Sequence, residues 1–258
     1  MQKKFGGFYG EEALYAGVAC VNAPGANINR TPYGSRASEY MSEDGVLNYN
    51  VAANIIGTAR KKGLIMNIKH CFLNNQETGR QRVATFCNEQ AIREIYLKPF
   101  EIVVKEARGK VYFTSDDQGT KDYKVMRGTT AVMTSFNNVG TTMASACAPL
   151  LTNVLRNEWG FQGEVITDFG PYVDYDNMIR SGNDYLLNAN WGGDKPELSK
   201  VFKDTESATA KSVMRRCVKN MCYTVVNSAA FNGVAPGSKT YRDIAPWRFL
   251  LGGVDAVF

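Results

Sequence analysis

The sequence predicts an α/β fold in which helices connect the strands of a parallel sheet, and three observations support this prediction. Short apolar runs alternate along the chain with longer amphipathic stretches. Polar or glycine-containing residues follow most of the apolar runs, as at the carboxyl ends of parallel strands, where such folds carry their sites. The length of 258 residues suits one α/β barrel, which has about 250 residues. We therefore expect a (β/α)8, TIM-barrel-like architecture that is partial or rearranged.

The apolar runs and amphipathic stretches give the individual elements. The candidate strands are residues 17–23, 64–69, 131–135, 164–168 and 185–187. The candidate helices are residues 48–62, 88–107, 147–159, 173–181 and 206–228. The order of these elements, strand followed by helix, predicts a parallel sheet with helical crossovers.

Residues 109–130 interrupt this alternation. Two β-prone runs, residues 111–114 and 123–126, flank the polar stretch 115–122, and this pattern predicts an inserted β-hairpin. Residues 233–258 are rich in glycine, proline and aromatic side chains and predict an irregular tail. The domain organisation that follows is one barrel over residues 1–232 and the tail at 233–258.

The composition argues against several classes of partner. The net charge is +5, but the basic residues are scattered in short pairs rather than gathered on one face, which disfavours nucleic-acid binding. No run of about 18 apolar residues is present, so we expect no membrane span. Residues 1–12 lack the apolar core of a signal peptide, and we therefore expect a cytoplasmic location. A homo-oligomer remains compatible with the sequence.

The six cysteines contain no pair at C-x-x-C spacing, and most lie in apolar or helical stretches. Reduced thiols in a reducing compartment are the simplest interpretation. The chain holds a single histidine and no cluster of metal-ligand residues, so we expect no metal and no other cofactor.

Lys69 and His70 close an apolar run and precede the polar run NNQE at residues 74–77. Their cation, imidazole, amides and carboxylate supply many hydrogen-bond donors and acceptors, which suit a polyol better than a phosphate. The alternative is a histidine that caps the strand beside a surface loop. Spacing alone favours this structural alternative slightly.

Asp168 ends another apolar run, where a carboxylate can act as a nucleophile or base or can cap the next helix. Arg36 precedes Ser42, Glu43 and Asp44, and its guanidinium can either orient hydroxyl groups or hold a loop through ion pairs. The string DFG at residues 168–170 is not a kinase motif, because no glycine-rich loop and no His-Arg-Asp loop precede it. A serine hydrolase is disfavoured by the absence of G-x-S-x-G.

Together, these strings resemble the catalytic barrel of glycoside hydrolase family 3, the family of many β-glucosidases. The matching stretches occur in the family's order over residues 10–232 and read APGANINRTP to SED, KH with NNQE, REIYLKPF, TSFN, LTNVLRNEWGFQGEVITD and SGND. The resemblance implies a retaining glycosidase that acts on β-linked glucosides or related sugars. A branch of the family that carries K-H-x-P-G-H-G is disfavoured, because residues 69–75 read KHCFLNN.

The resemblance assigns roles to individual residues. Asp168 aligns with the catalytic nucleophile, while Arg36, Lys69 and His70 align with residues that hold sugar hydroxyls. Phe136 stands in the substrate site where many members have tyrosine, so that hydroxyl is missing here. A nucleophile must be ionised, and we expect Lys69 or Arg36 to keep the pKa of Asp168 low.

Two family features have no counterpart in the sequence. The family's first strand ends in Asp-Gly-Pro, and the general acid usually comes from an α/β sandwich domain; neither is found here. The resemblance therefore implies a barrel incomplete at its N-terminal strands, in a fragment, a truncated product or one subunit of a split enzyme. The expected partners are a carbohydrate and a sandwich domain or second chain that supplies the acid/base. The alternative function is a non-catalytic carbohydrate-binding or scaffold remnant.

Overall fold

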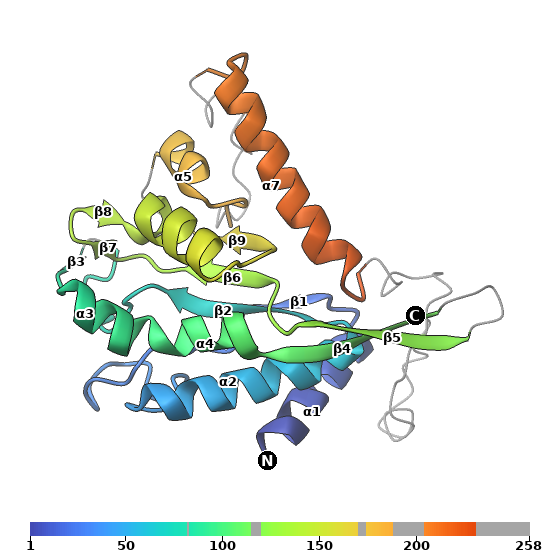
Figure 1. Cartoon of the computed structure of the whole chain (residues 1–258). Coiled ribbons are helices and arrows are strands. Elements are labelled where there is room, and N and C mark those ends of the chain that lie inside the picture. The colour runs from blue at the N-terminus through green and yellow to red at the C-terminus, as the bar shows by residue number, and fades with distance from the viewer. Residues whose placement is uncertain (82, 115–119, 170–173, 188–203, 231–258) are drawn as a thin grey trace.

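The fold is built on a four-stranded parallel sheet with the strand order β1-β2-β6-β9 (Figure 1). The computed structural model describes residues 1–81, 83–114, 120–169, 174–187 and 204–230. The four strands are Cys20–Val21 (β1), Ile65–Cys71 (β2), Ala131–Thr134 (β6) and Glu164–Ile166 (β9). A single parallel bridge from Ile166 to Tyr185 continues the sheet beyond β9.

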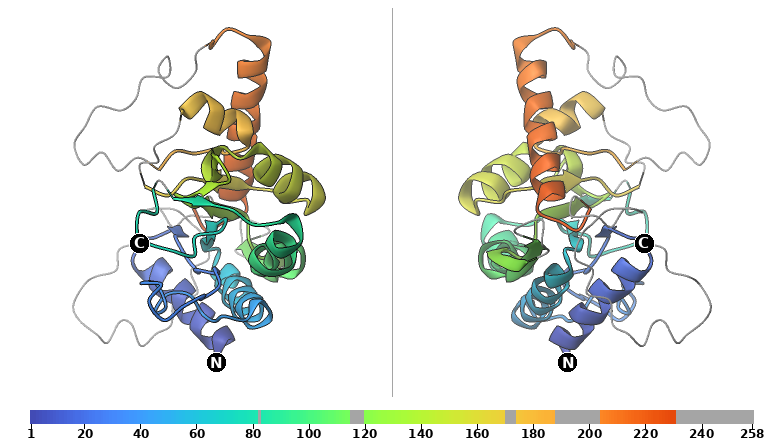
Figure 2. Two further views of the ribbon diagram at one scale, coloured as in Figure 1. Left: turned by 90° about the vertical axis from the view of Figure 1, so that its left-hand side faces the viewer. Right: turned by 90° about the vertical axis from the view of Figure 1, so that its right-hand side faces the viewer.

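Helices cover one face of this sheet, as the end-on views show (Figure 2). They are α2 (Gly45–Ala59) with the short η1 (Arg60–Lys62), α4 (Lys98–Glu106) and the π-helix η4 (Pro149–Glu158). The segments Glu89–Ala91 (α3) and Ile92–Tyr96 (η2) lead into α4, and Ala144–Ala146 (η3) leads into η4. α1 (Gln2–Tyr15) packs against α2, while α5 (Tyr175–Ser181) and α7 (Ala208–Val226) lie at the β9 end.

The hydrophobic core lies between the sheet and these helices. One face of β2, β6 and β9 contributes Ile68, Val132 and Val165, which are all fully buried. The three covering helices contribute side chains such as Ile56 of α2, Phe100 of α4, and Leu151 and Leu155 of η4. Because successive strand residues face opposite sides, the neighbours of these core residues on the other face include Asn67 and Glu164.

Local capping explains where several helices begin. The Asp44 carboxylate accepts a hydrogen bond from the amide of Val46 at the start of α2. Asn88, Asp174 and Ser207 accept equivalent bonds at the starts of α3, α5 and α7. Each side chain satisfies a backbone N–H group that has no partner within its own helix.

Two further strand groups flank the central sheet. The antiparallel hairpin of Arg108–Thr114 (β4) and Lys121–Arg127 (β5) confirms the predicted insertion, with longer strands than expected. Residues 115–119 of its turn lie outside the described part of the chain. A small second sheet, which no pattern in the sequence predicts, consists of Ala84–Thr85 (β3), Asn138–Val139 (β7) and Thr142–Met143 (β8).

The sequence prediction of a mixed α/β fold with a parallel sheet is confirmed. Four of the five expected strands form within a few residues of their predicted bounds, whereas the fifth appears only as the bridge at Tyr185. In the described residues the central sheet has four strands and does not close into an eight-stranded barrel. The expected irregular tail at 233–258 lies outside the described residues.

Candidate active site

The carboxyl ends of the sheet strands bring together residues from distant parts of the sequence. Asn27 brackets the backbone of His70, because its Oδ1 accepts from the His70 amide at 2.7 Å and its Nδ2 donates to the His70 carbonyl at 2.9 Å. Ser135, which follows β6, donates its hydroxyl to the Phe72 carbonyl at 2.7 Å. Segments that follow different strands therefore meet at one edge of the sheet, as parallel strands predict.

His70 and Asp168 are the central pair of the site. The Nε2 atom of His70 lies 3.5 Å from the Oδ2 atom of Asp168, so both side chains face the same space. Both are buried, with exposed fractions of 1% for His70 and 8% for Asp168. The other carboxylate oxygen of Asp168 accepts a hydrogen bond of 2.8 Å from the amide of Phe169.

The pKa of Asp168 differs from the expectation. Burial raises this pKa above its ordinary value, and the amide of Phe169 and the cations of Arg80, Arg36 and Lys69 oppose the rise without reversing it. The prediction that Lys69 or Arg36 keeps the pKa low was therefore wrong in its net direction. The sequence could show the cations but not the loss of water around the carboxylate.

Arg36 and Lys69 are joined through Glu39. Glu39 accepts from the Arg36 guanidinium and from the Lys69 ammonium group, each at 2.7 Å. The Nη1 atom of Arg36 also lies 3.5 Å from Glu77. Arg36 thus pairs with Glu39 and Glu77 rather than with the carboxylates of Glu43 and Asp44, one of which caps α2 instead.

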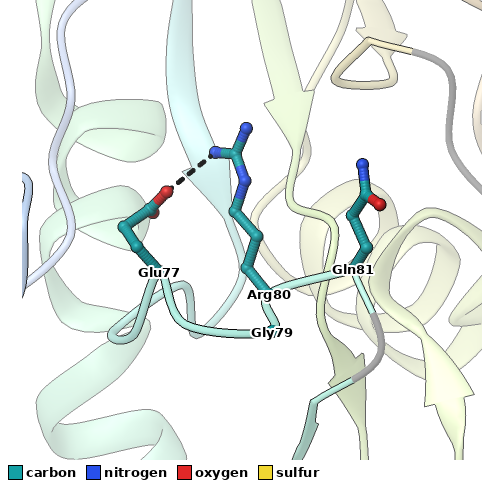
Figure 3. Close-up of a pocket in the computed structure, with 4 residues that line it drawn as sticks. All are labelled: Glu77, Gly79, Arg80 and Gln81. Atoms are coloured by element: carbon teal, nitrogen blue, oxygen red, sulfur yellow. Dashed lines mark ion pairs between the residues drawn. The ribbon is translucent and has the colours of Figure 1, made fainter.

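Arg80 is the third cation of the site, and its side chain lines a pocket. A pocket of about 300 Å³ is lined by Glu77, Gly79, Arg80 and Gln81, and Figure 3 shows the Arg80 guanidinium directed at Glu77. The two side chains pair at 3.1 Å. The guanidinium carbon of Arg80 lies 4.6 Å from the ring centre of Phe136, which is itself buried. This cation–π contact places Phe136 beside the charged cluster.

Tyr40 and Asn74 complete the polar surroundings of His70. The Tyr40 hydroxyl lies 3.0 Å from His70 Nδ1 and accepts a 2.7 Å hydrogen bond from the Asn74 amide. Burial lowers the pKa of His70 well below its ordinary value, and Arg36 and two other nearby cations lower it further. His70 is consequently neutral near pH 7, with one ring nitrogen that donates and one that accepts.

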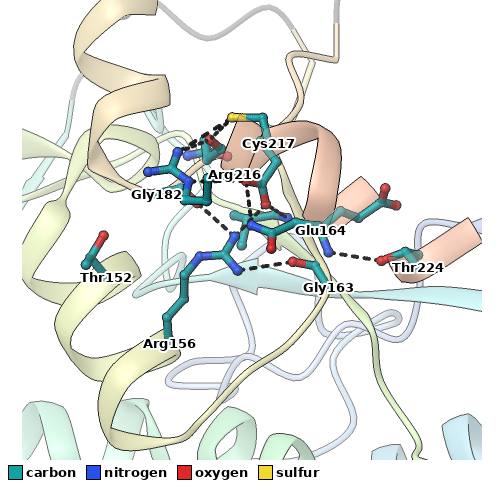
Figure 4. A network of polar contacts seen from close by, with 12 residues as sticks. Thr152, Arg156, Gly163, Glu164, Gly182, Arg216, Cys217 and Thr224 are labelled. Carbon is teal, nitrogen blue, oxygen red and sulfur yellow. Dashed lines mark hydrogen bonds and ion pairs between the residues drawn. The ribbon is translucent and has the colours of Figure 1, made fainter. Parts of the chain in front are cut away.

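A second polar network holds β9, the strand that precedes Asp168. Asp184 has no exposed side-chain surface and accepts hydrogen bonds from Arg156 at 2.5 Å and from Asn220 at 2.9 Å. The Arg216 Nε atom lies 3.7 Å from the same carboxylate. Figure 4 shows how Arg156 of η4 and Arg216 of α7 converge on this network beside Gly163, which precedes β9.

Three residues of the site were not singled out from the sequence: Glu39, Tyr40 and Arg80. Tyr40 and Glu39 lie within the same matching stretch as Arg36, and Arg80 follows Glu77 by three residues. Their place in those stretches is a signal that could have directed attention to them. Among the described residues, no group of three or more His, Cys, Asp or Glu side chains could hold a metal, and no helix is long and apolar enough to cross a membrane.

Known proteins with similar sequences and structures are glycosidases. The chain is 35% identical over 179 residues to an exo-α-(1→6)-L-arabinopyranosidase of Bifidobacterium longum, covering 69% of this chain and 21% of that protein. It is 32% identical over 213 residues to β-glucosidase A of Butyrivibrio fibrisolvens, covering 82% of this chain and 23% of that protein. No protein-family model matches the chain.

The fold is similar to that of a solved enzyme. The structure of the GH3 β-glucosidase of Bifidobacterium adolescentis superposes with a TM-score of 0.76 at 27% identity, covering 93% of this chain and 32% of that one. The chain thus spans between a fifth and a third of each of these proteins. The sequence motifs, the relatives and the shared fold identify this chain as a homologue of part of the β-glucosidases of glycoside hydrolase family 3.

Proposed function

We propose that the chain contributes the nucleophile and much of the sugar-binding site of a retaining glycoside hydrolase that acts on β-linked glucosides or related pyranosides. One observation carries the proposal: a buried carboxylate, Asp168, lies at a strand end opposite the neutral imidazole of His70. Three cations lie near enough to act on the pKa of this carboxylate. Such a site can bind sugar hydroxyls through hydrogen bonds, and it can place a carboxylate beside the anomeric carbon.

In the proposed mechanism Asp168 attacks the anomeric carbon while the glycosidic C–O bond breaks. A general acid protonates the departing oxygen, and the same group then takes a proton from the water that cleaves the glycosyl ester. The two carboxyl groups of retaining glycosidases lie about 5–5.5 Å apart. We propose that an α/β sandwich domain or a second chain supplies the acid, and that the four-stranded sheet belongs to a (β/α)8-like barrel.

Arg36, Lys69 and His70 are proposed to hold sugar hydroxyls, and the geometry adds Arg80 to this group. The ion pairs with Glu39 and Glu77 hold the long side chains of the cations in fixed positions. We propose Phe136 as an apolar wall of the site, since the Arg80 guanidinium carbon lies 4.6 Å from the centre of its ring. The proposal covers glucosides and related pyranosides, since the relatives include both a β-glucosidase and an α-arabinopyranosidase.

Covalent labelling tests the proposal. The full chain is incubated with a 2-deoxy-2-fluoro-β-glucoside that carries an activated leaving group, and its peptides are then analysed by mass spectrometry. Activated leaving groups need little protonation, so the label should appear on Asp168 even without the acid, whose loss costs about 10²–10⁴-fold with natural substrates. Asp168→Asn should abolish labelling, whereas Asp204→Asn, at an exposed turn, should leave it unchanged.

Two outcomes would contradict the proposal. Labelling of Asp168→Asn at the rate of the wild type would mean that another residue is the nucleophile. A wild-type chain that binds glucose but is not labelled, even with a sandwich domain of a related enzyme added, would support the carbohydrate-binding or scaffold remnant instead.

A further inference from the structure

The surroundings of His70 define which of its two ring nitrogens carries the proton. Its Nδ1 atom faces the Tyr40 hydroxyl at 3.0 Å, and its Nε2 atom faces Asp168 at 3.5 Å. A hydroxyl can donate or accept, so the Tyr40 contact alone permits either tautomer. The direction of that contact depends on the other partners of Tyr40.

Asn74 determines the direction. Its Nδ2 atom lies 2.7 Å from the Tyr40 oxygen and 2.9 Å from Glu77 Oε1. Glu77 pairs with Arg36 and Arg80, and its carboxylate oxygens accept hydrogen bonds. An Asn74 amide turned the other way would bring its oxygen against that carboxylate. The NH2 group of Asn74 thus donates to both oxygens.

The Tyr40 hydroxyl therefore accepts from Asn74 and keeps its own proton to donate. Within the described part of the chain, His70 Nδ1 is the acceptor within hydrogen-bond distance of that proton. Tyr40 is buried, and a buried hydroxyl proton without an acceptor is unfavourable. Burial also raises the pKa of Tyr40, so that the hydroxyl stays protonated.

We infer that Tyr40 is a positioning residue that holds His70 as the neutral Nε2–H tautomer, with this N–H directed at Asp168 and at a substrate hydroxyl beside it. The opposite tautomer would point a lone pair of Nε2 at the carboxylate oxygen 3.5 Å away. The hydrogen bonds that link Glu77, Asn74, Tyr40 and His70 thus determine the partial charge that the imidazole presents. They decide whether it attracts or repels the anion that the proposed function requires. The consequence for catalysis rests on that proposed function, whereas the tautomer does not.

Nitrogen NMR tests the tautomer directly, because His70 is the only histidine in the chain. The full chain, purified with a histidine-free tag, is labelled with ¹⁵N-histidine, and couplings from the ring protons assign the two nitrogen signals. We expect an unprotonated Nδ1 and a protonated Nε2 at neutral pH and above, since the pKa of His70 is lowered well below its ordinary value of about 6.5. A protonated Nδ1, or an imidazolium ion at neutral pH, would overturn the inference.

Two variants separate positioning from packing. Tyr40→Phe keeps the ring and removes the hydroxyl, so the His70 spectrum should shift toward the Nδ1–H tautomer. The rate of fluoroglycoside labelling of Asp168 should also fall about tenfold, which corresponds to roughly one hydrogen bond. Tyr33→Phe is the matched control, because Tyr33 is 90% exposed, and should change neither measurement.

The NMR experiment and the labelling experiment test the tautomer and the proposed function separately. An unchanged tautomer and an unchanged labelling rate in folded Tyr40→Phe would refute the positioning role of Tyr40. If Tyr40→Phe does not fold, the wild-type tautomer still decides the inference. A wild-type chain that shows the Nε2–H tautomer but no labelling would contradict the proposed function and leave the hydrogen-bond assignment intact.

Discussion

The carboxylate of Asp184 lies against the strand that leads to Asp168, and its Oδ2 atom accepts a hydrogen bond of 2.9 Å from the amide of Val165. Two arginines from different helices, Arg156 and Arg216, reach the same carboxylate. The side chain of Asp184 is fully buried and that of Arg156 nearly so. One carboxylate thus connects β9 with η4 and α7.

Removing this carboxylate should destabilise the fold strongly. Asp184→Ala leaves buried arginine charge without its partner, and the loss of one member of a buried pair costs about 3–5 kcal/mol. Urea unfolding of the wild type and the variant measures this difference. Asp176→Ala is the control, because its 2.9 Å pair with Arg180 is more exposed and should contribute less than about 1 kcal/mol. Equal losses of unfolding free energy in the two variants would show that the buried Asp184 carboxylate stabilises the fold no more than the Asp176 pair does.

Glu164 should make the stability depend on pH. Burial, with a further contribution from the charge of Asp184, raises the pKa of Glu164 from 4.5 to about 7. The folded state then binds a proton that the unfolded state releases, so the wild type loses stability as the pH rises from about 4.5 to about 7. The largest loss that this shift allows is about 3 kcal/mol above pH 7.

Glu164→Gln should remove that dependence, because the amide carries no charge at any of these pH values. The free energy of unfolding of the variant should exceed that of the wild type by about 1–3 kcal/mol at pH 8 and by clearly less at pH 5. Urea titrations at the two pH values measure the difference. If the stability difference between the variant and the wild type does not grow with pH, the surroundings of Glu164 do not disfavour its charged form.

The central elements could be predicted because their sequence signals are local. The apolar run of residues 131–135 and the amphipathic stretch 206–228 match β6 and α7 closely, since burial on defined faces imposes their periodicity. The helix α1 was missed for the opposite reason. Gly6, Gly7 and Gly10 lower its intrinsic helix propensity, and its stability comes from packing on α2.

The residues of the candidate site that end apolar runs could be predicted from the sequence, whereas those in the loops between strands could not. Asp168 and His70 end apolar runs, so their shared edge follows from parallel topology. The position of Tyr40 against His70 depends on how a loop returns across the sheet, which no local pattern encodes. The raised pKa of Asp168 likewise depends on burial by distant segments.

The glycines of α1 give a matched pair of substitutions. A Cβ atom at Gly6 would lie 2.2 Å from Thr58 Oγ1 and 2.3 Å from the Ile55 carbonyl oxygen, whereas one at Gly7 would meet nothing within 4 Å. Gly7→Ala should therefore stabilise the protein by up to about 1 kcal/mol through helix propensity. Gly6→Ala should destabilise it by about 1–3 kcal/mol, because α1 must move away from α2. Thermal unfolding of both variants measures this, and similar melting temperatures would contradict the close packing.

All six cysteines should carry reduced thiols. The structure pairs none of the six thiols, and we expect native mass spectrometry with and without reductant to give six free thiols. Cys20 and Cys222 are both exposed residues, yet burial of the Cys20 thiol and the nearby charge of Glu164 raise its pKa to about 12.

Alkylation should therefore distinguish the two exposed cysteines. Because the thiolate is the reactive form, a pKa of about 12 leaves Cys20 with a much smaller thiolate fraction at pH 7.5 than an ordinary thiol, whose pKa is about 8.5. Iodoacetamide should modify Cys222 at least about tenfold faster than Cys20, as followed by peptide mass spectrometry. In Glu164→Gln, the repulsion between the two anions is gone, and Cys20 should react faster than in the wild type while Cys222 is unaffected. Equal rates for the two cysteines in the wild type would show that the Cys20 thiol is open to solvent and not coupled to Glu164.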